Sequence, residues 1–85
     1  MSQKTVIVAN VLDKYSNPVA ELVQEACKYD SEILLVSGTR RINAKSIMGI
    51  MAFNPCEGMS VEIITNGQDE LDALTAIENY LTCRR

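Results

Sequence analysis

The side chain best placed for chemistry in this 85-residue sequence is the hydroxyl of Ser46. It stands near the start of the string KSIMGIM, which spans residues 45–51. A serine followed by four large apolar residues within five positions is typical of a helix N-cap, where its oxygen accepts a hydrogen bond from a first-turn amide. The amino end of a helix also carries partial positive charge, which tolerates a phosphate. Ser46 is therefore either a plain N-cap or a phosphorylation site that also caps the helix.

The apolar residues after Ser46 predict an exposed surface. Ile47 and Met48 point about 100° apart on a helix, so Ile47, Met48 and Met51 cannot all face one core. We expect one methionine to fill the core and the other to lie exposed beside isoleucine.

No metal centre or cofactor site is predicted. The chain has no histidine, and its three cysteines, Cys27, Cys56 and Cys83, show no CxxC spacing. We expect three reduced thiols, as in a cytoplasmic protein.

Composition limits the remaining functions. The net charge is −3 with acids and bases mixed along the chain, which argues against direct nucleic-acid binding. The longest apolar run, Ile33 to Val36, is too short to span a membrane, and no signal peptide precedes the first strand-like segment. We expect one cytoplasmic domain over residues 1–85.

The first half of the chain predicts a strand, a loop, a helix and a hairpin. Residues 5–8 are a β-branched strand, residues 10–16 a polar loop, and a helix starts at Pro18, capped by Ser16 or Asn17. Its apolar stripe consists of Val19, Leu22, Val23, Ala26 and Cys27. Residues 32–36 and 39–43 predict a hairpin joined by Ser37-Gly38.

The second half predicts a short helix, a strand and a final helix. The helix after Ser46 ends near Asn54-Pro55, and residues 60–66 form a strand that Gly67 breaks. Asp69 caps the last helix, whose expected apolar face consists of Leu71, Ala73, Leu74, Ala76, Ile77, Tyr80 and Leu81. The order βαββαβα predicts an α+β open-faced β-sandwich, a four-stranded antiparallel sheet with three helices on one face.

Strand alternation divides the apolar side chains between the two faces of this sheet. The face toward the helices should hold Val6, Val8, Ile33, Leu35, Val61 and Ile63. The open face then receives Ile7, Leu34, Val36 and Ile64, where polar residues are usual. These four are either tolerated surface residues or a patch for a homodimer or another partner.

The string KSIMGIM closely resembles the regulatory-serine segment of the HPr family, the small phosphocarriers of the bacterial sugar phosphotransferase system. The likeness covers essentially the whole chain without a detectable insertion and includes Gln3-Lys4-Thr5, Leu22-Val23-Gln24, Lys28-Tyr29-Asp30, Gly58, Gly67 and Asp72-Ala73-Leu74. It implies the spatial strand order 1-4-2-3.

The resemblance also shows what this chain lacks. Family members carry a phosphorylatable histidine just before the first helix, an arginine two residues later and a glycine two residues earlier. The matching positions here are Tyr15, Asn17 and Asp13. A tyrosine hydroxyl has a pKa near 10 and is a weak nucleophile without an activating base, and asparagine cannot replace a guanidinium. We therefore expect no catalytic residue and no histidine phosphocarrier activity.

The resemblance implies a regulatory protein, similar to the catabolite-repression HPr-like branch, rather than an enzyme. In this interpretation HPr kinase/phosphorylase phosphorylates Ser46, and a LacI-type transcription factor then binds Lys45, Ser46, Ile47, Met48 and Met51. One alternative is a diverged paralogue that binds a partner or itself through the open sheet face. A further alternative is residual phosphotransfer through Tyr15.

Overall fold

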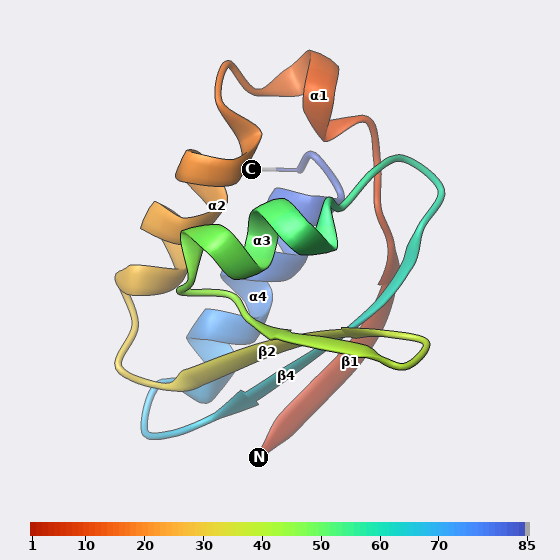
Figure 1. Ribbon diagram of the computed structural model, residues 1–85. Coiled ribbons are helices and arrows are strands. Elements are labelled where there is room, and N and C mark those ends of the chain that lie inside the picture. Colours follow the sequence, from red (N-terminus) through yellow and green to blue (C-terminus); the bar gives the residue numbers. More distant parts are fainter. Residues whose placement is uncertain (85) are drawn as a thin grey trace.

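The computed structural model describes residues 1–84, which form a four-stranded sheet and four helices (Figure 1). In chain order the elements are β1 (Ser2–Ile7), α1 (Val11–Lys14), α2 (Pro18–Cys27), β2 (Glu32–Ser37), β3 (Arg40–Asn43), α3 (Ile47–Phe53), β4 (Ser60–Asn66) and α4 (Glu70–Leu81).

The sheet has the order β1-β4-β2-β3, and each neighbouring pair is antiparallel. Val6 pairs with Val61, and Leu35 pairs with Ile63 and Ile42. Helices α2, α3 and α4 lie on the same side of the sheet (Figure 1). The α+β open-faced sandwich and the strand order implied by the resemblance are both confirmed.

The core lies between the sheet and these helices. All six side chains predicted for the inner face of the sheet are buried: Val6, Val8, Ile33, Leu35, Val61 and Ile63. The alternation is clear on β1, where Val6 is 7% exposed and Ile7 is 60% exposed. Leu34, Val36 and Ile64 are partly exposed on the open face, as strand alternation requires.

Two segments differ from the sequence-based expectation in their local structure. Residues 11–14 form the single helical turn α1 inside the expected polar loop, because Asn10 caps it through a 3.3 Å bond from the Asp13 amide and Val11 is buried. The hairpin loop is Gly38-Thr39 rather than Ser37-Gly38, because Ser37 still pairs with Arg40. Gly38 has φ +62° at the first loop position, as a type II′ hairpin requires.

The apolar stripes predicted for α2 and α4 are longer than the faces that these helices bury. Cys27, the last residue of α2, and Leu71, near the start of α4, are exposed although the apolar period includes them. In both helices the apolar spacing continues in the sequence beyond the turns that pack on the core. Asp69 occupies the N-cap position of α4, but its side chain makes no capping bond. Its carboxylate instead accepts hydrogen bonds from the Asp30 amide and from the amide and hydroxyl of Ser31, which ties the start of β2 to α4.

None of the helices within residues 1–84 is long and apolar enough to cross a membrane.

Candidate functional site

Ser46 occupies the N-cap of α3, as the sequence predicted. Its Oγ accepts a hydrogen bond of 3.1 Å from the Gly49 amide, and its backbone is extended at φ −103° and ψ 115°. The side chain remains partly exposed. A Cβ added at Gly49 would lie 3.3 Å from both the Cβ and the Oγ of Ser46, so the glycine leaves the hydroxyl room to sit against the helix.

The outer side of α3 is apolar. Ile47, Met48 and Met51 are 52%, 82% and 62% exposed, whereas Ile50 and Phe53 on the inner side are buried. We call these three exposed residues the α3 surface. The expectation that one methionine fills the core is wrong, because Ile50 and Phe53 already provide the inward contacts of a helix of seven residues.

Two basic residues hold α3 in place. Arg40 donates from Nη2 to the Ala52 carbonyl at 2.6 Å, and its guanidinium lies 5.1 Å from the centre of the Phe53 ring. Lys45 donates from Nζ to the Tyr29 carbonyl at 2.7 Å, which joins the start of α3 to the end of α2. Sequence reasoning missed Arg40, since these contacts follow no periodicity along the chain.

The hydroxyl of Tyr15 is directed into the fold. Tyr15 is buried, donates to the Tyr80 carbonyl at 2.8 Å and stacks on the Tyr80 ring, with centroids 4.1 Å apart and planes 9° from parallel. The Tyr80 hydroxyl donates in turn to the Pro18 carbonyl at 2.6 Å. The pair joins the start of α2 to the end of α4 and places the Tyr15 hydroxyl in the core.

The start of α2 is capped by its own side chains. Asn17 Oδ1 accepts from the Ala20 amide at 3.4 Å, and Glu21 Oε2 accepts from the Asn17 amide at 2.9 Å. This reciprocal arrangement resembles a capping box. A carboxylate therefore occupies an amide that would otherwise be open to an incoming anion, and Asp13 adds a second negative charge earlier in the chain.

The two carboxylates with depressed pKa values serve the fold at the start of α4. The Ser2 hydroxyl, the amino terminus and the Gly67 amide lower the pKa of Glu70 to about 2. The Ser31 hydroxyl and the Asp30 amide lower the pKa of Asp69. Both groups join the ends of strands to α4, so these shifts indicate structural hydrogen bonds.

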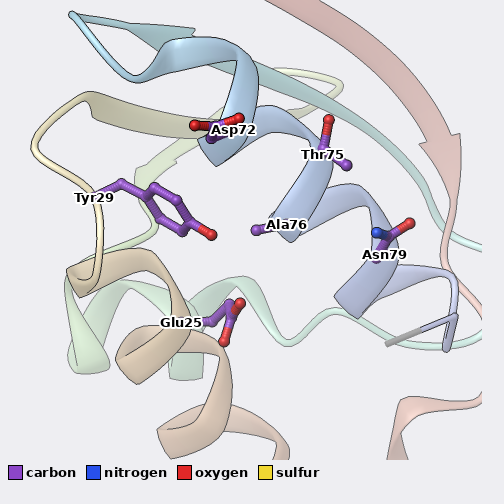
Figure 2. A pocket seen from close by; sticks show the side chains of 6 residues that line it. All are labelled: Glu25, Tyr29, Asp72, Thr75, Ala76 and Asn79. Atoms are coloured by element: carbon purple, nitrogen blue, oxygen red, sulfur yellow. The ribbon is translucent and has the colours of Figure 1, made fainter.

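A shallow groove of about 450 Å³ lies between α2 and α4 (Figure 2). Its lining consists of Glu25, Tyr29, Asp72, Thr75, Ala76 and Asn79, and the Tyr29 hydroxyl points toward Ala76 on α4 (Figure 2). Glu25 already pairs with Lys28 at 3.0 Å. Within residues 1–84 no three histidine, cysteine, aspartate or glutamate side chains converge as possible metal ligands, and all three cysteines are free thiols.

Comparison with known proteins places this geometry in context. Residues 2–82 match the family model described as the PTS HPr component phosphorylation site. The phosphocarrier protein HPr of Treponema pallidum is 47% identical over 78 residues, which cover 92% of this chain and 89% of that protein.

Solved structures of similar proteins share the fold. HPr from Bacillus anthracis is 37% identical and superposes with a TM-score of 0.86 over 95% of this chain and 96% of that chain. The catabolite-repression protein Crh of Bacillus subtilis is 33% identical, with a TM-score of 0.71 over 89% of this chain and 83% of that chain. The Crh structure is described as an intertwined dimer with a swapped domain.

Proposed function

Because the chain belongs to the HPr family, we propose that it is a regulatory member of that family, phosphorylated on Ser46, rather than a histidine phosphocarrier. The observation that carries this proposal is the contrast between two hydroxyls. The Tyr15 hydroxyl, at the family's histidine position, is bonded inside the core, whereas the Ser46 hydroxyl is partly exposed beside the α3 surface.

Phosphorylation of Ser46 requires only its hydroxyl and an external kinase. The Ser46 oxygen attacks the γ-phosphorus of ATP, ADP leaves, and a base of the kinase takes the hydroxyl proton. The product gains about 1.5 to 2 negative charges at the amino end of α3, where the Gly49 amide already donates to Ser46. Because that end of the helix is electropositive, the modification stabilises α3 rather than disrupting it.

The α3 surface supplies the second half of the recognition element. Met48 and Met51 are flexible, polarizable side chains, and both are largely exposed next to the phosphate position. A partner that contacts both the phosphate and these side chains distinguishes the phosphorylated from the unphosphorylated protein. We assign this role to a LacI-type transcription factor, with HPr kinase/phosphorylase as the modifying enzyme.

Lys45 contributes to this surface mainly by position. Its ammonium bonds the Tyr29 carbonyl, so it fixes the start of α3 and leaves the phosphate to be neutralised by the partner. A partner with an arginine at this point would bind the phosphate through paired hydrogen bonds.

The proposal is tested by intact mass after incubation with HPr kinase/phosphorylase and ATP. We expect one added phosphate on the wild-type chain, none on Ser46→Ala, and one on the matched control Ser16→Ala, which removes an exposed serine beside α2. An unmodified wild-type chain would refute the proposal. Binding to the transcription factor is then compared between the two forms by titration, and equal affinities would refute the corepressor role.

A further inference from the structure

We propose that two copies of this chain associate face to face through the open side of the sheet, around a two-fold axis that runs along β2. This inference is independent of Ser46. It rests on the order of apolar and charged side chains across the sheet.

The open face carries a compact apolar cluster. Leu34 pairs directly with Ile64 on β4, and Val36 is the next outward residue on β2. We call Leu34, Val36 and Ile64 the sheet patch. Ile7 does not belong to it, because Ile7 pairs with Ser60 at the far end of β1, with Thr5 and Glu62 in between. The four apolar residues expected on this face therefore do not form one patch.

Two opposite charges flank β2 symmetrically. Val36 pairs with Glu62 on β4 and with Arg41 on β3, so one row across the sheet reads Glu62, Val36, Arg41. Strands lie about 4.8 Å apart, which places the two charges at equal distances on either side of Val36. The ion pairs formed between residues 1–84 use other side chains, and the neighbouring Arg40 is bonded to Ala52.

Rotation by 180° about an axis along β2 makes this row self-complementary. Val36 then faces Val36 and Leu34 faces Leu34 of the second copy, while each Glu62 faces the Arg41 of the other. Packed sheets are about 10 Å apart, a gap that a glutamate and an arginine span together. The contact is isologous, so both charge pairs form at once and the assembly closes as a dimer.

The size of the contact predicts a weak dimer. Only β4, β2 and β3 overlap in this arrangement, and the patch side chains are partly covered by their own neighbours. Such an interface belongs among the small, transient ones of less than about 1,200 Å². Helix α3 lies on the opposite side of the sheet (Figure 1), and Ser46 caps that helix, so both copies keep the α3 surface free.

The test is sedimentation equilibrium from about 10 μM to about 1 mM, a range that spans weak interfaces. We expect the apparent mass of the wild type to rise with concentration. Glu62→Arg and Arg41→Glu should each weaken dimerisation at least about tenfold, since like charges then face each other. Ser16→Arg, a charge at an exposed position beside α2 and away from the open face, is the matched control and should leave dimerisation unchanged. Amide spectra confirm that each variant is folded, and if Glu62→Arg is not, the exposed Arg41→Glu carries the same comparison.

Mixing the two reversed variants gives the sharpest result. A chain with Glu62→Arg presents two arginines on this face, and a chain with Arg41→Glu presents two glutamates. The equimolar mixture should therefore form a heterodimer, whereas each variant alone stays mostly monomeric. An interaction within one chain cannot produce that recovery. A wild type that stays monomeric to 1 mM, a mixture that stays monomeric, or a dimer that survives both reversals, as one made by exchanged segments would, overturns the proposal.

Discussion

Replacement of Tyr15 by phenylalanine separates a structural from a chemical role for this residue. The variant removes the 2.8 Å hydrogen bond to the Tyr80 carbonyl and keeps the stacked rings. A hydrogen bond of this kind contributes about 1 kcal/mol net. The Tyr80 carbonyl retains the Cys83 amide as a donor at 3.2 Å, so no full penalty for an unpaired buried oxygen is added. We expect the free energy of unfolding to fall by about 1 kcal/mol, or about 4–8 °C in Tm for a domain of this size.

The assay is urea and thermal unfolding followed by circular dichroism. Tyr29→Phe is the matched control, because the Tyr29 hydroxyl faces the open groove, and its loss should change stability by less than about 0.5 kcal/mol. Tyr15→Leu also removes the stacking and some buried area, so it should cost at least about 0.5–1.5 kcal/mol more than Tyr15→Phe. Unchanged stability of Tyr15→Phe, or transfer of label from phosphoenolpyruvate and enzyme I onto the wild-type tyrosine, would refute the structural role.

Three further outcomes follow from the geometry. The free energy of unfolding should be constant near neutral pH and fall as the pH drops from about 4.5 toward 2. The reason is that the fold depresses the pKa values of Asp69 and Glu70, so both groups protonate more readily when the chain is unfolded. Glu70→Gln should flatten this part of the profile of urea midpoint against pH. Gly67→Ala should lower Tm clearly more than Gly38→Ala, because its Cβ would lie 2.7 Å from the Ser31 Cα, whereas the space around Gly38 is open. Met48→Lys should change the free energy of unfolding by less than about 0.5 kcal/mol, because Met48 is exposed. The same variant, once phosphorylated, should bind the transcription factor about tenfold or more weakly. Equal affinities of variant and wild type in a fluorescence titration would show that Met48 is not part of the recognition surface.

Much of the fold was predictable from the sequence because burial imposes a period on it. The strand 60–66, the inner faces of the sheet and the Ser46 cap were all correctly placed. The segment 11–14 was not, because a single turn fixed by Asn10 and Val11 is too short to leave a periodic pattern. The first strand was predicted to start at residue 5, but β1 starts at Ser2. Residues 2–4 are polar and show no apolar alternation, and they are held at the sheet edge by strand pairing and by contacts with α4.

At the candidate site the sequence predicted the Ser46 cap and an exposed apolar side of the helix, but not the contacts around them. Spacing alone placed Ile47 and Met48 about 100° apart on a helix. It could not show that Met48 and Met51 are both exposed, because that depends on which side chains fill the core. The burial of Tyr15 was equally unpredictable, since it results from stacking on a residue 65 positions later in the chain. Contacts between distant segments carry no local signature.

The ring pair of Tyr15 and Tyr80 limits what residue 15 can become. Replacement of Tyr15 by histidine would remove one of the two stacked tyrosine rings and the bond that joins the start of α2 to the end of α4, while Glu21 would still accept from the Asn17 amide. Such a replacement would weaken the fold without opening the Asn17 amide. Packing of the two rings therefore makes residue 15 part of the framework of the domain rather than part of an exposed reactive surface.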